Sequence, residues 1–540
     1  MKDTSIMTKR LNLSTRWSRA AALLALTAAP ALATAGMPSE RILEMGLADL
    51  RSALDSGTIT SAELVAAYLE RIASVDQPVG GVHAVLAING KALDQAKAWD
   101  ARRAQQGAGH PNAALAGIPF LAKDNFDAVG LPNTGGSLAL AQSMPASNAF
   151  VVQKLLDQGA ILLGKTNLSE LAASYGWYGY SAVGGQTLNP FNSLRTADGS
   201  SSGSAAAVAA KLAPFALGTD TTGSIRSPAS VTGTVGMRST MGLVSRTGII
   251  PMSLTADVAG AITRTVADQA IVLDAIQAED KNDASTKSVA RPQKPMADGL
   301  SGSTLEGKVI AVVDNFDGAN PEVDDIKRSA VAAMQKAGAR VVNIRLPKVF
   351  ETLQPAVLGP IGVAEFKPQF ETYLSGLPSG QPRDLREFIS RLDTVTEKGT
   401  RGMNPGRYKG LLENLETRAT DSPGYIQLLT ITIPEIRRQL NEVLDTGRYD
   451  ALFYPTIGCT APVVPGKSDP SFVCKAYAYA AAKIASTTGF PEVTVNGGVA
   501  TGNLPVGVSF LGKAGSDAKV LEIASAFESV QRAKAISKND

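Results

Sequence analysis

Residues 198–226 read DGSSSGSAAAVAAKLAPFALGTDTTGSIR, in which two turns of small residues are joined by a helix and a strand. The first turn runs into an alanine-rich segment that predicts a helix over 204–212. Apolar residues at 213–217 predict a buried strand, and the small residues 220–224 predict a tight turn directly after it. This order is typical of an α/β fold that presents side chains at the end of a buried strand.

The same alternation extends along much of the chain. Short apolar runs recur, most of them flanked by Gly, Pro or Asp, and helical spacing separates several of them. The predicted strands are 82–88, 115–122, 160–163, 309–313, 449–454 and 492–495, and the predicted helices are 151–158, a pair within 45–74 and a broken series over 349–425. Ser61 is the expected N-cap of the second helix of that pair. We therefore expect an α/β architecture with a buried sheet.

Composition limits the class of protein. The chain has 540 residues, of which 19% are charged and 44% hydrophobic, and this excludes a disordered or collagen-like chain. A formal net charge of +3 does not suggest a strongly basic surface. We therefore expect no nucleic-acid partner.

The N-terminus has the pattern of an export signal. A basic region ends at Arg19, an apolar Ala-Leu run follows, and residues 31–33 and 33–35 offer small-x-small cleavage sites. An uncleaved membrane anchor is the alternative, but Pro30 interrupts a run already short for a span. We expect residues 1–35 to be a signal peptide of a bacterial protein that is periplasmic or secreted, without stable membrane insertion after cleavage.

Cysteine and histidine are scarce. Cys459 and Cys474 share one short segment, where they could close a loop or remain unpaired thiols. No Cys or His cluster has zinc-ligand spacing, so no metal is expected. His83 and His110 lie in an apolar run and a polar loop, where structural or solvated roles are commoner than catalysis. A nucleophile in this chain would need another base.

Three short motif matches have simpler structural explanations. The sequence GAILLGKT at 159–166 fits a phosphate loop, but four consecutive apolar residues favour a buried strand. The sequence GSSSG at 199–203 fits a hydrolase elbow but lacks a plausible histidine partner. The S-x-x-K match at 516–519 begins a helical pattern, so Ser516 is more simply a helix cap.

Lys123 ends the apolar run in GIPFLAKDN, residues 117–125. Desolvation at that position disfavours the ammonium and can turn a lysine into a base. The neighbouring Asp124 would restore the charge, but adjacent side chains of a strand point to opposite faces. A strand-end lysine that reaches solvent is the alternative for Lys123 alone. In the turn at 220–224, successive backbone N–H groups can converge on an anion beside the Ser224 hydroxyl.

Together these segments resemble the amidase signature family. Further blocks resemble the family in the same order, at 164–170, 189–190, 242–246, 257–264 and 504–508. The resemblance runs from about residue 47 to residue 530. It implies one domain over 36–540 with a central mixed β-sheet covered by helices on both faces, a catalytic core at about 110–275 and a variable substrate-covering region at about 349–425. No cofactor is implied.

The resemblance also assigns roles. It implies Ser224 as nucleophile, Ser200 as bridging serine after a cis peptide bond, and Lys123 as general base. It implies oxyanion donors from the backbone N–H groups of Thr221, Thr222, Gly223 and Ser224.

Four positions depart from the family pattern. Asp198, Ser202 and Thr222 stand where glycine is usual, and Asn496 stands where proline is usual. A β-branched residue resists positive φ, so Thr222 puts the geometry of the oxyanion turn in question. None of these positions supplies a reacting atom.

The sequence says less about the substrate than about the catalytic residues, and it does not identify the substrate-binding residues. The acyl pocket is expected to include 138–143, 175–186 and 349–425. Trp177, Tyr178 and Tyr180 precede a block similar to exported bacterial peptide amidases, which favours peptide C-terminal amides or other bulky acyl or aryl amides. Core packing explains these aromatic residues equally well.

Other activities remain open. The alternatives are a glutaminase-type transamidation subunit, an esterase or carbamate hydrolase of the same family, and a catalytically silent binding protein. The only expected partner is an amide substrate, and the sequence does not give the oligomeric state.

Overall fold

A computed structural model describes residues 37–536, except 107–112, 397–401 and 418–419. The predicted export signal at 1–35 and His110 lie outside the described residues. The chain from Met37 onward groups into one compact unit.

Strands of the described residues form one eleven-stranded sheet, in the order β1-β3-β2-β8-β10-β9-β14-β15-β13-β11-β12. The strands are β1 (Val85–Ile88), β2 (Pro119–Lys123), β3 (Ile161–Thr166), β8 (Phe215–Asp220), β9 (Val235–Arg238), β10 (Val258–Thr263), β11 (Val309–Val313), β12 (Arg340–Ile344), β13 (Ala451–Pro455), β14 (Glu492–Ala500) and β15 (Leu504–Leu511). Two small hairpins pair β4 (Tyr180–Ser181) with β5 (Gly185–Gln186) and β6 (Leu188–Asn189) with β7 (Asn192–Thr196). The sheet is mixed, because β2 is parallel to β3 and β8 whereas β10 is antiparallel to β8 and β9.

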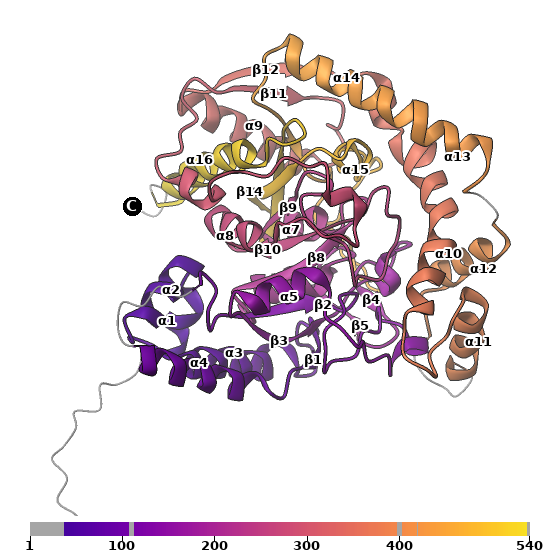
Figure 1. Cartoon of the computed structure of the whole chain (residues 1–540). Helices are drawn as coiled ribbons and strands as arrows, with labels where there is room; N and C mark the ends of the chain where they lie inside the picture. Colours follow the sequence, from indigo (N-terminus) through magenta and orange to yellow (C-terminus); the bar gives the residue numbers. More distant parts are fainter. Residues whose placement is uncertain (1–36, 107–112, 397–401, 418–419, 537–540) are drawn as a thin grey trace, which may run out of the picture. The chain divides into compact units, whose positions relative to one another are not determined.

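Helices connect these strands (Figure 1). They are α1 (Ser39–Glu44), α2 (Leu47–Asp55), α3 (Ser61–Arg71), α4 (Ala92–Gln106), α5 (Phe150–Asp157), α6 (Ser202–Ala209), α7 (Arg226–Thr232), α8 (Val266–Ile276), α9 (Pro321–Lys336), α10 (Gly359–Ser375), α11 (Leu385–Thr396), α12 (Pro405–Glu416), α13 (Pro423–Gln427), α14 (Ile433–Thr446), α15 (Lys483–Thr488) and α16 (Asp517–Ile536).

Alternate residues of β11 show that helices cover both faces of the sheet. Ile310 and Val312 belong to the core cluster that contains residues of α8, α9 and α16. Ala311 and Val313 belong to a second cluster, which contains residues of α14 and α15. Because successive side chains of a strand point to opposite faces, the two clusters lie on the two sides of the sheet. The expected fold class is confirmed.

The predicted strands recur with shifted ends, and others were missed. The run at 115–122 yields β2, which begins only at Pro119, and the phosphate-loop match is the buried strand β3. Strands β9, β10, β12 and β15 were not predicted. The N-cap of α3 is Thr60 and not Ser61, because Thr60 exchanges bonds with Glu63 in a capping box while Ser61 Oγ accepts from Arg103.

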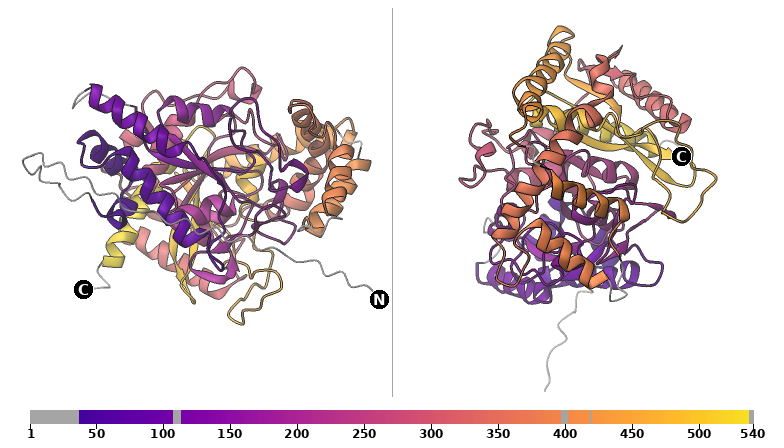
Figure 2. Two further views of the ribbon diagram at one scale, coloured as in Figure 1. Left: turned by 90° about the horizontal axis from the view of Figure 1, so that it is seen from below. Right: turned by 90° about the vertical axis from the view of Figure 1, so that its right-hand side faces the viewer.

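The carboxyl ends of parallel strands β2, β3 and β8 meet at one edge, where their last residues are Lys123, Thr166 and Asp220. Ligands of α/β proteins bind outside such ends. Helices α10, α11 and α12 form a group of their own beside the sheet in all views (Figures 1 and 2). Phe370, Phe388 and Leu411 build its apolar core.

Candidate active site

Lys123 is fully buried at the end of β2 and contacts hydroxyl groups. Its amine lies 2.7 Å from Ser200 Oγ, 3.0 Å from Ser201 Oγ and 2.8 Å from Thr219 Oγ1. Among the described residues no carboxylate lies within ion-pair distance of this amine. Burial lowers the pKa of Lys123 to about 7, although the charges of Asp220 and Asp257 act in the opposite direction. A substantial neutral fraction of the amine therefore exists at neutral pH.

Asp124 points away from Lys123, as the strand pattern predicts. Its carboxylate pairs with Lys165 of β3 at 2.9 Å and also accepts a hydrogen bond from the Thr134 hydroxyl. Both members of this ion pair are buried. The negative charge next to Lys123 in sequence is thus neutralised on the other face of the strand.

Ser200 lies two residues before the start of α6. The Gly199–Ser200 peptide bond is cis, as the resemblance implies. Asp198, which stands where glycine is usual, has a φ of 58° and so adopts the left-handed conformation that favours glycine. The Ser201 N–H donates to the Ser224 carbonyl oxygen at 3.1 Å, which holds the two serine segments together. The hydrogen bonds among the described residues include none between the hydroxyls of Ser200 and Ser224.

The four expected oxyanion donors lie in the turn after β8, and three of their N–H groups are not bonded to another described residue. The Gly223 N–H donates to Asp220 Oδ1 at 2.9 Å, and this bond removes Gly223 from the expected donor set. The N–H groups of Thr221, Thr222 and Ser224 have no acceptor among the described residues. Gly223, not Thr222, takes the positive φ of this turn, at 119°. The β-branched Thr222 is therefore compatible with the turn.

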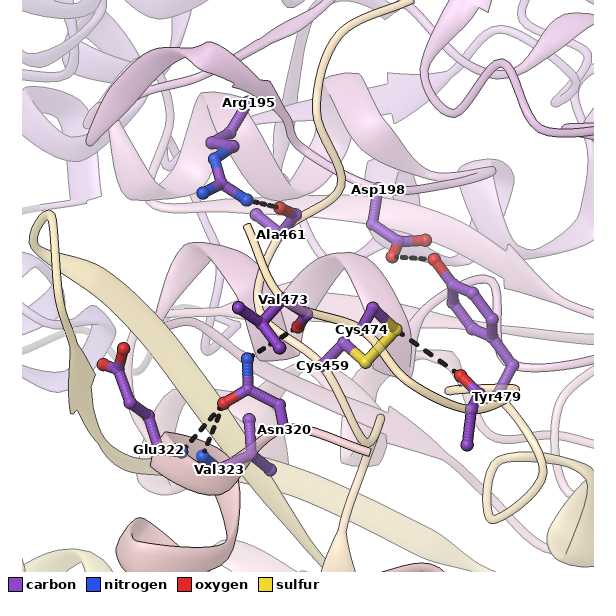
Figure 3. Close-up of a disulfide and its surroundings, with 11 residues drawn as sticks. Arg195, Asp198, Asn320, Glu322, Val323, Cys459, Ala461, Val473, Cys474 and Tyr479 are labelled. Carbon is purple, nitrogen blue, oxygen red and sulfur yellow. Dashed lines mark hydrogen bonds between the residues drawn. A yellow bond between two sulfur atoms is a disulfide. The ribbon is translucent and has the colours of Figure 1, made fainter. Parts of the chain in front are cut away.

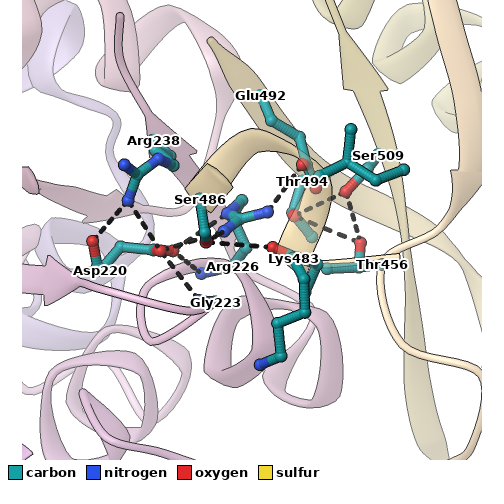
Figure 4. Close-up of polar contacts among 12 residues, drawn as sticks. Asp220, Gly223, Arg226, Arg238, Thr456, Lys483, Ser486, Glu492, Thr494 and Ser509 are labelled. Carbon is teal, nitrogen blue, oxygen red and sulfur yellow. Dashed lines mark hydrogen bonds and ion pairs between the residues drawn. The ribbon is translucent and has the colours of Figure 1, made fainter. Parts of the chain in front are cut away.

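Asp220 at the start of this turn is held by two buried arginines (Figure 4). Arg226 donates to both carboxylate oxygens at 3.0 Å, and Arg238 donates to the Asp220 carbonyl oxygen at 2.6 Å. Arg226 also bonds Glu492 of β14 at 2.6 Å. Although burial opposes ionisation, the two guanidinium groups hold the pKa of Asp220 well below its usual range. The charged cluster thereby fixes the turn against the sheet.

The other side of the turn faces a cavity of about 410 Å³. Ser224 and the neighbouring residues 221–223 line it, together with parts of α10, α12 and the segment before α15. Besides the Ser224 turn, the lining includes Tyr175 and Tyr178 from the expected segment 175–186, and residues of the expected region 349–425. From the region 349–425 these are Gln354, Leu358, Val363, Phe366, Arg407 and Asn414. Asp198, Tyr477, Tyr479 and Lys483 line it as well, although the sequence did not place them there. The wall therefore comes largely from segments far from Ser224 in sequence.

Asp198 and two tyrosines form one polar corner of the cavity. The Tyr479 hydroxyl donates to Asp198 Oδ2 at 2.8 Å, and the Tyr178 and Tyr479 rings stack with centroids 5.4 Å apart. Burial raises the pKa of Asp198 to about 6. Lys483 donates to the Thr222 carbonyl oxygen. The carboxylate and the ammonium thus both border the Ser224 turn.

A disulfide joins Cys459 to Cys474 in the segment that leads to Tyr479 (Figure 3). The two Cα atoms are 5.6 Å apart. This settles the alternative that the sequence left open in favour of a closed loop. Nothing in the sequence indicated that this loop precedes a cavity wall.

Some residues of the expected pocket segments do not reach the cavity. His83, for which the sequence predicted no catalytic role, does not line it either. Trp177 and Tyr180 pack edge to face with each other outside the lining, and residues 138–143 contribute nothing to it. Leu140 instead packs in the core of the α10–α12 group, and this apolar burial explains why that part of the pocket prediction was wrong.

A family model described as Amidase matches residues 63–521, and the chain therefore belongs to the amidase family. It is an amide-hydrolysing enzyme. Within the described part of the chain, no helix has both the length and the apolar character of a membrane span.

Individual relatives are similar over nearly the whole chain. The crystal structure of peptide amidase from Stenotrophomonas maltophilia superposes with a TM-score of 0.80 and 35% identity, covering 91% of this chain and 97% of that one. Mandelamide hydrolase of Pseudomonas putida is 33% identical over 91% of this chain and 92% of its own length. A glutamyl-tRNA(Gln) amidotransferase subunit of Salinispora arenicola is 34% identical over 90% of this chain and 97% of its own length.

Proposed function

We propose that amide hydrolysis proceeds through an acyl-enzyme on Ser224, with Ser200 passing the proton between Ser224 and the neutral amine of Lys123. The environment of Lys123 carries this proposal. Its amine is buried, hydrogen-bonded to hydroxyls and free of a carboxylate partner among the described residues, and its pKa is lowered to about 7. An amine in this state can accept a proton near neutral pH.

The proton moves along a short path. Lys123 takes the Ser200 hydroxyl proton while Ser200 takes that of Ser224, and the Ser224 oxygen forms a bond to the substrate carbonyl carbon. Since the two hydroxyls are not hydrogen-bonded in this structure, rotation of Ser224 Oγ toward Ser200 is required first. The C–N bond then breaks as the proton returns through Ser200 to the leaving nitrogen. Water repeats the sequence on the ester and releases the acid.

The N–H groups of Thr222 and Ser224, with Thr221, stabilise the oxyanion. They border the cavity and have no acceptor among the described residues. Such a donor contributes about 3 to 4 kcal/mol to transition-state stabilisation in related chemistry. The hydrogen bond from Lys483 to the Thr222 carbonyl oxygen holds the peptide group that follows the Thr222 N–H.

Peptide C-terminal amides or other bulky acyl or aryl amides are the proposed substrates. The similarity to a peptide amidase and to mandelamide hydrolase supports this class. The cavity of about 410 Å³ bordered by Tyr178, Tyr477 and Tyr479 has room for such an acyl group.

Ser224→Ala tests the mechanism. Release of ammonia, amine or alcohol is measured on a panel of peptide amides, aryl anilides, fatty amides, esters and carbamates. The wild type should be fastest on peptide or aryl amides, and the variant should lose turnover on every amide by about 10³-fold or more. A variant that retains turnover contradicts the acyl-enzyme on Ser224. Faster cleavage of esters or carbamates by the wild type would reassign the substrate class.

A transamidation role is the second candidate, favoured by the similarity to a glutamyl-tRNA(Gln) amidotransferase subunit. We infer instead that residues 1–35 direct export. The Cys459–Cys474 disulfide supports this, because disulfides persist mainly in oxidising compartments. Cell fractionation with N-terminal sequencing tests it: a cytosolic protein with an intact N-terminus would favour the transamidation role.

A further inference from the structure

Arg407 lies in α12 and lines the active-site cavity although its side chain is fully buried. None of its three guanidinium nitrogens has a hydrogen-bond partner within the described part of the chain. An unpaired polar group in the interior costs free energy, and a buried charge costs more. A partner supplied by the substrate would remove that cost.

Other fully buried arginines of the chain differ from Arg407 in this respect. Arg195 pairs with Asp469 at 2.7 Å, and Arg226 pairs with Asp220 and Glu492. Neither of them lines the cavity. Arg238 is bonded to Asp220 through one nitrogen, while its other two nitrogens have no partner in the described part of the chain. Among these four described arginines, Arg407 is the one that has no bonded nitrogen, and it is the one that lines the cavity.

The guanidinium group of Arg407 is oriented by aromatic rings. Its central carbon lies 4.3 Å from the ring centroid of Phe366 and 5.9 Å from that of Tyr175. The rings contact the guanidinium group without accepting its hydrogen bonds, and none of its nitrogens has an acceptor among the described residues. The guanidinium group offers forked donors, which match the two oxygens of a carboxylate.

The charges around the cavity also leave Arg407 uncompensated. Lys483 and Asp198 both border the Ser224 turn, where their charges offset each other. Glu170 is the acidic group that acts on Arg407, but no ion pair joins them, and burial raises the pKa of Glu170 to about 7. Glu170 is therefore only partly ionised at neutral pH and does not fully offset the charge of Arg407 on the α12 side of the cavity.

We propose that Arg407 is a specificity-determining residue that binds a carboxylate on the acyl part of the substrate, away from the scissile amide. This inference rests on the proposed amide hydrolysis at Ser224. It narrows the substrates to linear amides whose acyl group ends in, or carries, an anionic carboxylate.

Matched substrates test the charge requirement. The probes are the monoamides of succinic, glutaric and adipic acids, each compared with the amide in which a methyl ketone replaces the carboxylate. The ketone keeps the shape and one acceptor oxygen but carries no charge. For at least one length, kcat/KM of the wild type for the carboxylate should exceed that for the ketone by about tenfold or more.

Variants locate the effect. Arg407→Met should raise KM for the carboxylate until the preference is lost, with kcat/KM for the ketone within about threefold of wild type. Arg407→Lys keeps the positive charge but lacks the paired N–H donors of a guanidinium group, so it should retain part of the preference for the carboxylate substrate. This variant replaces Arg407→Met in the test if the methionine variant does not fold. Lys409→Met removes an exposed positive charge from the same helix and should keep the full preference.

A binding measurement separates this inference from the mechanism. In Ser224→Ala protein, the same carboxylate monoamides should raise the Tm, and Arg407→Met should abolish that rise. A wild type that favours ketones, equal losses on both substrates in Arg407→Met, or the absence of any Tm rise would overturn the carboxylate site. The proposed hydrolysis fails by a different result, namely no turnover of any amide of the wider panel.

Discussion

Two lysines on neighbouring parallel strands are equally buried but have different partners, and the proposed mechanism gives a chemical role to only one of them. Lys123 ends β2 and Lys165 lies in β3, and both are fully buried. Lys165 contacts the Asp124 carboxylate at 2.9 Å and the Phe126 carbonyl oxygen at 2.7 Å. Lys123 contacts the hydroxyls of Ser200, Ser201 and Thr219.

The partners of each amine determine its use. A carboxylate stabilises the ammonium form, so Lys165 remains a structural cation. Hydroxyl groups compensate desolvation less completely, and the pKa of Lys123 falls to about 7. Burial alone therefore does not make a base, and what matters at Lys123 is that no described carboxylate pairs with its amine.

The largest expected effect comes from the hydroxyl-bonded lysine. Lys123→Ala should lower kcat by about 10³-fold or more, because the variant lacks the amine that accepts the Ser200 proton. The carboxylate monoamides should still raise the Tm of this variant. Steady-state ammonia release and circular dichroism measure activity and folding together, and turnover within tenfold of wild type would refute the proton path.

The carboxylate-bonded lysine should instead affect folding. Lys165→Met leaves the Asp124 carboxylate buried without its cation and should lower the free energy of unfolding by about 3 to 5 kcal/mol. Activity per folded molecule should stay within about tenfold. Denaturant unfolding measures this.

A double variant sharpens the same contrast. Adding Asp124→Asn to Lys165→Met should restore part of the lost stability, because the unpaired charge is removed. If Lys165→Met cost no stability but abolished turnover, the division between the two lysines would be wrong.

The pH dependence should follow Lys123. Only the neutral amine accepts a proton, so kcat/KM should rise about tenfold per pH unit below pH 7 and level off above it. Asp198, with a pKa of about 6, also titrates near this range. Asp198→Asn should leave the midpoint near 7, and a shift with that variant would assign the profile to Asp198.

The free energy of unfolding should also depend on pH because of the lowered pKa of Lys123. Folding lowers the pKa of Lys123 from 10.5 to about 7. Between pH 7 and 10.5 the unfolded chain therefore binds more protons at this residue than the folded protein does. Lys123 therefore adds to stability as pH rises through that window and makes its least favourable contribution below it. Lys123→Met should flatten this part of the stability profile.

The smallest effect is expected from the disulfide. Cys459→Ser with Cys474→Ser should loosen the segment that carries Tyr479 and raise KM by about threefold, without moving the pH midpoint of kcat/KM. A changed pH midpoint would mean that the segment carrying Tyr479 affects the pKa of Lys123. The cavity wall and the base would then not act independently.

The sequence predicted the motif residues individually, but it predicted the cavity wall only as the segments 175–186 and 349–425, both of which contribute to the lining. Lys123, Ser200 and Ser224 belong to local patterns, and the period of two in a strand correctly turned Asp124 away from Lys123. Arg407 and Tyr479 belong to no such pattern, because their position in the cavity depends on packing of segments about 200 residues from Ser224.

Local charge also changed one expected detail. The Gly223 N–H was expected to donate to an oxyanion, but it donates to Asp220 Oδ1 at 2.9 Å. Strands β10 and β15, whose apolar runs are interrupted by glycine, likewise had no clear sequence signal. Both features depend on neighbours that only the folded sheet supplies.

The protonation state of Lys123 decides whether its amine can act as a base near neutral pH. Protein labelled with ¹³C at the lysine ε-carbon is titrated by NMR, and the resonance that is absent from Lys123→Met identifies the residue. We expect a midpoint near pH 7 for that resonance. A midpoint above pH 10, like that of a solvent-exposed lysine, would contradict it.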